Sequence, residues 1–257
     1  MLAIERRNII MSVLREDRHV VVGELAKKFN VSEETIRRDL DKLAQDGKVI
    51  KTYGGAVLAE EKESDLPFFV RKRANVEAKK KIAELVSQVV EDGDTIILDA
   101  SSTAVFTVQR LKTKKDLTVI TNSVEVLMEL ADIIGWRVIS TGGTLKQNSS
   151  ALIGTQAEDM LSGYHVNKAI LSCSGVDKMY GFTDSNDFHA AVKRKMLSCA
   201  TNKIFAVDSS KYGKCSLVSV CGFKNVDMVI TEKEPDGEWK EIFSSNGIDC
   251  LYPREDL

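Results

Sequence analysis

Short apolar runs recur along the larger part of this 257-residue chain, and stretches with helical patterning separate most of them. The expected strands are residues 95–98, 117–120, 137–140, 168–171, 204–207, 217–220 and 228–230. A helix is expected ahead of them, at residues 76–91. Apolar strands that alternate with helices are typical of a mostly parallel sheet covered on both faces. The sequence therefore predicts an α/β domain over residues 76–257.

Polar and small residues follow five of these runs. Ligands of open parallel sheets bind beyond the carboxyl ends of the strands. Hydroxyls and helix-start N–H groups there form a cradle for an anion. Each loop alone also fits an ordinary helix cap or turn, but their meeting at one edge favours a binding site. The candidate site residues are Asp99, Ser101, Ser102, Thr103, Thr121, Asn122, Ser123, Gly142, Gly143, Asp177, Lys193 and Lys211.

These residue types suit a phosphorylated polyol. Carboxylates such as Asp99, Asp177 or Asp208 could accept hydrogen bonds from sugar hydroxyls, and Lys211 or Lys193 could neutralise a phosphate.

The first 57 residues carry a different pattern, which predicts a winged helix-turn-helix. Three helices are expected, at residues 3–16, at 23–29 and from the N-cap Ser32 to about Gln45, with Gly47 as a C-terminal stop. The first helix is expected to bury an apolar stripe of Ile4, Ile9, Ile10, Val13 and Leu14. Residues 48–57 are expected to form a hairpin, or wing, around a Gly-Gly turn.

The third helix has one apolar face and one cationic face. Ile36, Leu40 and Leu43 recur at i, i+4 and i+7, and Arg38 lies nearly opposite them. An ordinary solvated helix would have the same pattern, but the short preceding helix, the tight turn and the wing favour DNA recognition in the major groove. The residues predicted to contact DNA are Ser32, Glu34, Thr35, Arg37, Arg38, Lys42, Lys48, Lys51 and Tyr53.

Residues 5–57 resemble the DNA-binding signature of the DeoR family of transcription regulators. The resemblance lies in the run Val31–Leu40, in Leu43 and Gly47, and in the wing sequence Tyr53–Ala56. It implies that the helix carrying Thr-Ile-Arg-Arg-Asp-Leu enters the groove. Lys51 departs from the usual Arg and supplies a charge without a bidentate fork.

The resemblance continues over residues 67–232, through Pro67-Phe68, Arg71, Asn75, Lys79, Gly154 and the strand-end motifs. DeoR-type sensor domains are similar in fold to ribose-5-phosphate isomerase and glucosamine-6-phosphate deaminase, and typically bind sugar phosphates. The resemblance therefore implies a phosphorylated sugar effector whose signal passes through the joint between the domains. Ser101 stands where Gly is common. The expected organisation is a DNA-binding domain at 1–57, a charged linker at 58–75 and the sensor domain at 76–257.

An enzyme on the same fold is the main alternative, namely a sugar-phosphate isomerase fused to a DNA-binding module. Such chemistry needs a carboxylate base, for which Asp99, Asp177 and Asp208 are the candidates. His residues are scarce, and no nucleotide-binding glycine loop or zinc-protease motif occurs. The five cysteines have no metal-ligand spacing. We therefore predict a non-enzymatic regulator without cofactor or metal.

The expected partners are double-stranded operator DNA, a phosphorylated sugar and further copies of the chain. Helix-turn-helix proteins usually read two half-sites, so a dimer or tetramer is predicted. The formal net charge is −2, but Lys and Arg outnumber Asp and Glu in residues 1–55. No apolar run is long enough to span a membrane, and no secretory signal is evident, so a cytoplasmic repressor of a carbohydrate operon is expected.

Overall fold

The computed structural model describes residues 1–17, 19–46, 48–52, 54–58 and 66–253. It divides the chain into two compact units, Met1–Ala74 and Asn75–Leu257. No helix in the described part of the chain is long and apolar enough to cross a membrane.

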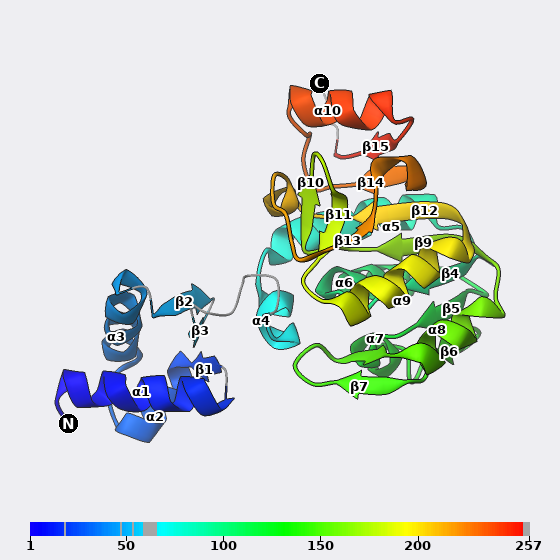
Figure 1. The fold of residues 1–257 in the computed structure, drawn as a ribbon. Coiled ribbons are helices and arrows are strands. Elements are labelled where there is room, and N and C mark those ends of the chain that lie inside the picture. Colours follow the sequence, from blue (N-terminus) through cyan, green and yellow to red (C-terminus); the bar gives the residue numbers. More distant parts are fainter. Residues whose placement is uncertain (18, 47, 53, 59–65, 254–257) are drawn as a thin grey trace. The chain divides into compact units, whose positions relative to one another are not determined.

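The first unit is a winged helix-turn-helix, as predicted (Figure 1). Its elements are α1 (Ala3–Asp17), β1 (His19–Val21), α2 (Val22–Phe29), α3 (Glu33–Gln45), β2 (Val49–Thr52), β3 (Gly55–Leu58) and α4 (Phe68–Arg73). The three strands form an antiparallel sheet in the order β1-β3-β2. Asn30 ends α2 in the left-handed conformation, which Asn tolerates better than most residues. Residues 68–73, placed in the linker by the sequence, form α4 within the first unit.

The core of the first unit differs in part from the predicted one. Ile10 and Leu14 are buried, but Ile4 and Ile9 are 61% and 38% exposed. The buried face of α1 consists of Arg6, Ile10 and Leu14, which share a face because they are spaced four residues apart. Arg6, and not Ile4, is therefore the first buried residue of the helix. The prediction was wrong for Ile4 and Ile9 because only apolar residues were sought on that face.

Arg6 is buried because it has a buried anionic partner. Its Nε lies 2.5 Å from Asp39 Oδ2, and the two residues are only 7% and 4% exposed. Arg7 adds a longer contact of 3.9 Å to the other carboxylate oxygen. The Asp of the Arg-Arg-Asp sequence therefore joins α3 to α1, and its side chain is turned away from solvent.

The two wing glycines are required for different reasons. Gly54 has a φ of +90°, a backbone conformation that side chains disfavour, and its carbonyl accepts a hydrogen bond from Val22 N. Gly55 is already part of β3 and pairs with both Thr52 and Val21. A Cβ on Gly55 would lie 1.9 Å from the Val20 carbonyl oxygen. The Gly-Gly pair thus combines a turn with a close strand contact.

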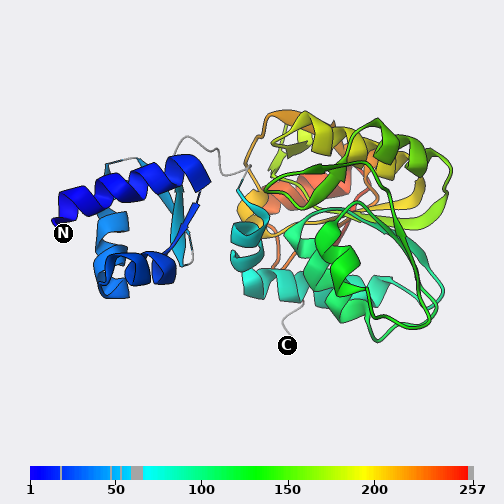
Figure 2. The same ribbon diagram turned by 90° about the horizontal axis from the view of Figure 1, so that it is seen from below.

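The second unit is built on a seven-stranded parallel sheet, as predicted. Its elements are α5 (Val76–Val89), β4 (Thr95–Leu98), α6 (Ser102–Leu111), β5 (Thr118–Thr121), α7 (Val124–Glu129), β6 (Arg137–Ser140), β7 (Thr144–Lys146), β8 (Ala151–Ile153), α8 (Thr155–Ser162), β9 (Val166–Leu171), β10 (Gly175–Asp177), β11 (Gly181–Asp184), α9 (Asp187–Ser198), β12 (Ala200–Ala206), β13 (Val218–Cys221), β14 (Met228–Ile230), α10 (Gly237–Ser245) and β15 (Asp249–Leu251). The strand order is β15-β14-β12-β9-β4-β5-β6. Helices α5, α6 and α7 form one layer, and α8 and α9 form another on the opposite face (Figure 2).

The strand order reverses direction between β4 and β9. The chain passes from β4 outward to β5 and β6, then returns to β9 on the other side of β4 and continues outward to β12, β14 and β15. In open parallel sheets, such a switch point opens a crevice beyond the carboxyl ends of the two central strands.

One predicted strand lies in a different sheet. Residues 217–220 overlap β13, which pairs antiparallel with β11 in a separate three-stranded sheet, β10-β11-β13. A parallel crossover needs a dozen or more residues, and only residues 222–227 separate β13 from β14. The apolar pattern identified the strand but not its partner. No strand was predicted at β10, β11 or β15, or in the β7-β8 hairpin.

Candidate functional site

The N-terminus of α3 is capped as predicted. Ser32 has an extended backbone, and its hydroxyl accepts a hydrogen bond of 3.2 Å from Thr35 N. The hydroxyls of Ser32 and Thr35 also lie 2.9 Å apart, within hydrogen-bond distance. These two side chains therefore order the start of the candidate recognition helix.

Cations line the exposed face of α3, each beside a carboxylate on the same helix or at its end. Arg37 lies 2.7 Å from Glu33, Arg38 lies 3.4 Å from Glu34, and Lys42 Nζ lies 3.7 Å from Asp46. Exposed pairs of this kind contribute only about 0–1 kcal/mol to stability, because water and salt screen them. Exchanging these carboxylates for DNA phosphates would therefore cost little.

The wing places further cations beside α3. Lys51 on β2 forms an ion pair with Asp41 of α3, and both side chains are about half exposed. Lys48 is exposed just before β2. Tyr53 and the helix stop at Gly47 lie outside the described residues. The described part of the predicted set thus lies on α3, at its N-cap, and on or directly before β2.

The centre of the second candidate site is Asp99, directly after β4 at the switch point. Its Oδ2 accepts a hydrogen bond of 3.0 Å from Ser172 N, which follows β9. Its Oδ1 accepts a hydrogen bond of 3.1 Å from Ser101 N. Asp99 is 1% exposed, and it ties together the ends of the two central strands.

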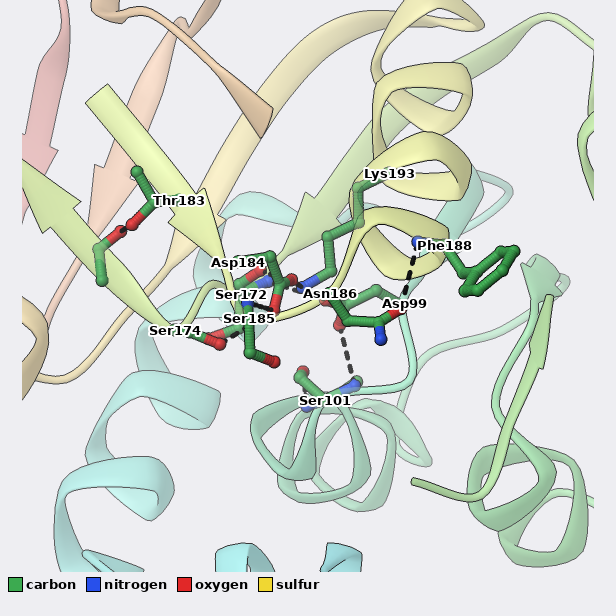
Figure 3. Close-up of polar contacts among 12 residues, drawn as sticks. Asp99, Ser101, Ser172, Ser174, Thr183, Asp184, Ser185, Asn186, Phe188 and Lys193 are labelled. Carbon is green, nitrogen blue, oxygen red and sulfur yellow. Dashed lines mark hydrogen bonds and ion pairs between the residues drawn. The ribbon is translucent and has the colours of Figure 1, made fainter. Parts of the chain in front are cut away.

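Lys193 joins this carboxylate to a second one that the sequence analysis did not single out (Figure 3). The ammonium, on α9, lies 3.1 Å from Asp99 Oδ2 and 2.5 Å from Asp184 Oδ2, and it donates to the Ser172 carbonyl at 2.7 Å. Ser174 Oγ donates to the other oxygen of Asp184 at 2.8 Å. We call Asp99, Asp184 and Lys193 the switch-point triad; two carboxylates share one ammonium in it.

Electrostatics hold the triad in its charged form. Burial acts to raise the pKa of Asp184, but the charge and hydrogen bond of Lys193 outweigh burial and lower that pKa to about 2. Burial acts to lower the pKa of Lys193, and the carboxylates of Asp184 and Asp99 raise it above its ordinary value. At neutral pH, Lys193 is therefore protonated and Asp184 is ionised.

Helix α6 begins at Ser102, directly after the loop that carries Asp99 of the triad. Ser101 caps the helix by accepting a hydrogen bond of 3.0 Å from Ala104 N, so its side chain is turned toward its own helix. Its φ of −78° is open to any residue, so a side chain is accommodated at this position without backbone strain. Ser102 and Thr103 are buried in the first turn, whose N–H groups have no carbonyl partner within the helix.

The loop after β5 is held mainly by contacts to its own strand and to β8. Thr121 Oγ1 accepts from Ser123 N, and Ser123 Oγ caps α7 through Val126 N. Asn122 donates its amide N–H to the Leu152 carbonyl at 2.9 Å. Its Oδ1 is buried and has no hydrogen-bond partner among the described residues. An acceptor left in this state is available to a donor that a ligand or water would bring.

The glycines after β6 adopt backbone conformations that other residues disfavour. Gly142 and Gly143 have φ angles of +62° and +103°. A Cβ on Gly143 would lie 2.6 Å from the Ile153 carbonyl oxygen, at the end of β8. This loop therefore packs closely against the β7-β8 hairpin.

Two other predicted residues lie at different places from the triad. Asp177 is at the turn end of the β10-β11 hairpin, and Asp184 is at the far end of β11 from that turn. Asp177 Oδ1 accepts from Met179 N and Tyr180 N, which stabilises that turn. Lys211 ends a short 3-10 turn, Ser209–Lys211, after β12. Because β12 pairs in parallel with β9, this turn follows a strand that neighbours one of the two central strands.

Asp184 is the main functional candidate that the sequence reasoning missed. It ends the run Gly181–Asp184, which is fully buried but too short and too polar to stand out as a strand. The sequence did carry a signal for it. Asp184 lies between the apolar Phe182 and the helix cap Asn186, which is the position of a carboxylate at a strand end before a helix. In the described residues, no cluster of His, Cys, Asp and Glu could hold a metal ion.

A winged helix-turn-helix followed by an α/β unit with a polar switch point defines a DNA-binding regulator with a ligand-sensing domain. Two family models match the chain: the DeoR-like helix-turn-helix domain over residues 6–62, and the DeoR C terminal sensor domain over residues 74–233. The chain belongs to the DeoR family of transcription regulators.

Curated relatives match over nearly their whole length. An uncharacterised HTH-type transcriptional regulator of Bacillus subtilis, YulB, is 40% identical over 92% of this chain and 91% of its own. The transcriptional repressor GlcR of the same organism is 32% identical over 98% of this chain and 97% of its own. The glycerol-3-phosphate regulon repressor of Escherichia coli is 28% identical over 95% and 96%.

Among solved structures, ribose 5-phosphate isomerase A of Methanocaldococcus jannaschii is similar, with a TM-score of 0.40 and 19% identity over 54% of this chain and 55% of that one. This likeness is too distant to bear on activity.

Proposed function

We propose that this regulator represses a carbohydrate operon by binding operator DNA through α3 and the wing, and that a phosphorylated sugar at the switch point changes its DNA affinity. The observation that carries the proposal is the meeting of strand-end loops around the switch-point triad. We include a homo-oligomer, a dimer or tetramer, because helix-turn-helix proteins usually read paired half-sites. The names of two relatives, a transcriptional repressor and a repressor of the glycerol-3-phosphate regulon, support repression and a phosphorylated signal.

The charges of the site indicate where the sugar and the phosphate of a phosphosugar would each bind. The triad has one ammonium and two carboxylates, so its net charge is negative and it would repel a phosphate. Sugar hydroxyls suit it better, because they can donate hydrogen bonds to the carboxylates. The phosphate would bind at the first turn of α6, whose N–H groups face outward from the helix, and at Lys211. Lys193 then acts mainly by fixing the two carboxylates.

The same arrangement argues against the isomerase alternative. A general base works best when its pKa is near the working pH. Asp184, with a pKa of about 2 and a bound ammonium, is a weak base. Asp99 is occupied by two backbone N–H groups and by Lys193. We therefore infer that the site binds its ligand without converting it.

Replacing Arg38 with Ala is expected to weaken operator binding about tenfold or more, because Arg38 is the exposed cation opposite the buried face of α3. Fluorescence anisotropy on a duplex selected by the wild-type protein from random sequences measures the effect. Arg15→Ala, an exposed cation at the end of α1, is the matched control and should bind normally. Normal binding by a folded Arg38→Ala protein would remove α3 from the interface.

A phosphosugar that binds the native second unit should raise its melting temperature by about 5 °C or more at a hundredfold excess over Kd. The unphosphorylated parent sugar should have little effect. Differential scanning calorimetry with compounds such as glucose 6-phosphate, ribose 5-phosphate and glycerol 3-phosphate, each beside its parent, tests this. Lys211→Met should melt like the wild type without ligand and lose the shift. If no phosphosugar stabilises the wild-type protein, the effector class is wrong.

A further inference from the structure

Asn75 occupies a particular position in the chain. It is the first residue of the second unit, and its chain neighbour Ala74 is the last residue of the first. Its backbone is left-handed, with a φ of 51°, and it directly precedes α5. Asn75 is therefore the residue at which the chain passes from the first unit into the second.

The side chain of Asn75 binds a loop more than 130 residues away in the sequence. Its amide N–H group donates to Asp208 Oδ1 at 3.0 Å and to Ser210 Oγ at 3.1 Å. Asp208 is 4% exposed, and the same oxygen accepts a hydrogen bond from Ser210 N at 3.1 Å. The joint residue is therefore hydrogen-bonded to the turn that follows β12.

That turn is fixed on its other side as well. Ser209 donates to Glu232 through both its backbone N–H, at 2.9 Å, and its hydroxyl, at 2.5 Å. Lys211 N donates to the Asp208 carbonyl at 3.0 Å. Within the described part of the chain, the Lys211 ammonium has no hydrogen bond or ion pair, so it is free to take up an anion.

We propose that Asn75 is the coupling residue of this regulator: it transmits the position of the Asp208–Lys211 turn to the joint between the DNA-binding and sensor units. An anion bound at Lys211 pulls on a turn whose Asp208 and Ser210 hold Asn75. Because Asn75 is covalently joined to Ala74, any change in its two hydrogen bonds alters how the chain leaves the first unit. The proposal rests on the proposed function for the nature of the signal, but the connection itself involves only residues of this chain.

The test is a double-mutant cycle that contains no effector. Ser209→Ala removes the hydroxyl bond to Glu232 and leaves the backbone bond, so it loosens the turn on that side. Asn75→Gly removes the amide while still allowing the left-handed backbone. Operator affinity is measured by anisotropy on the selected duplex for the wild type, both single variants and the double variant. Hydrogen exchange of residues 75–82 is followed in the same four proteins.

In the wild-type background, Ser209→Ala is expected to change operator affinity roughly fivefold or more and to alter exchange in the first turn of α5. In the Asn75→Gly background, it should change neither by more than about twofold. Equal effects in both backgrounds, or no effect of Ser209→Ala in the wild type, would overturn the proposal.

Asp116→Gly is the matched control, because Asp116 is also left-handed, with a φ of 57°, but precedes β5 at the amino end of the parallel sheet, whereas the Asp208–Lys211 turn follows β12 at the carboxyl end. The effect of Ser209→Ala must persist in that background. If Asn75→Gly fails to fold, Asn75→Asp serves in its place, since it tolerates the same backbone and sets a carboxylate against Asp208.

Repeating the measurements with phosphosugars distinguishes the role of Asn75 from the identity of the effector. A compound that stabilises the wild type should stabilise Asn75→Gly equally but no longer change its operator affinity. If no phosphosugar binds, the proposed effector fails, and the effector-free cycle still decides the role of Asn75.

Discussion

Replacing Asp39 with Ala is expected to destabilise the first unit by about 3–5 kcal/mol, because it leaves the Arg6 guanidinium buried without its counter-charge. The unfolded fraction of the helix-turn-helix should rise at moderate urea, and operator binding should be lost with it. Hydrogen exchange of α1 and α3 amides during a urea titration measures this loss separately from the second unit.

Asp41→Ala is the matched control on the same helix. Asp41 also pairs with a cation, Lys51, but both side chains are about half exposed, so the expected loss is at most about 1 kcal/mol. If the two variants unfold at the same urea concentration, the Arg6–Asp39 pair does not join α1 to α3 in the way the structure indicates.

Replacing Lys193 with Met should destabilise the second unit by a similar amount, about 3–5 kcal/mol, since two buried carboxylates would share no counter-ion. Both tryptophans of the chain, Trp136 and Trp239, lie in this unit, so tryptophan fluorescence reports its unfolding selectively. Lys195→Met, two residues along α9 and outside the triad, should have little effect.

The loss caused by Lys193→Met should shrink in acid. In the wild type, the pKa of Asp184 is lowered to about 2, so its stabilising contribution is present above the unfolded value near 4 and is lost as the pH falls toward 2. Without Lys193, burial raises the pKa of Asp184, and protonation in mild acid relieves the buried charge. Lys193→Met/Asp184→Asn should be more stable at pH 7 than Lys193→Met. A loss that stays constant from pH 7 to 3 would contradict this assignment.

Local patterns were sufficient to predict the helix-turn-helix and the wing of the first unit. The Ser32 cap, the apolar spacing of Ile36, Leu40 and Leu43, and the wing all depend on residues near one another in the chain. The alternation of runs likewise predicted the parallel sheet. The assumption that buried faces are apolar was wrong for α1 and α3. Arg6 and Asp39 are buried because each neutralises the charge of the other, and the periodicity of apolar residues cannot reveal such a pair.

The sequence predicted at which edge of the sheet the candidate site lies, but it did not predict which side chains contact one another there. The positions of Asp99 and Lys193 followed from strand ends and family resemblance, and the structure adds Asp184 as the residue that connects them. Asp177 lies at a hairpin turn, because β10 and β11 leave the main sheet after β9. Pairing of this kind depends on long-range geometry, which a run of apolar letters does not encode.

The bond between Ser172 N and Asp99 spans 73 residues of chain, because the two central strands are consecutive in space and distant in sequence. The helix-turn-helix, by contrast, is complete within the first 58 residues, and the strand pairs and the buried ion pair that hold it together join residues fewer than 40 positions apart. Local contacts form quickly, and domains generally fold as they leave the ribosome. During synthesis, the part that binds DNA is therefore expected to fold first, and a newly made chain would be able to hold an operator before it could respond to a metabolite.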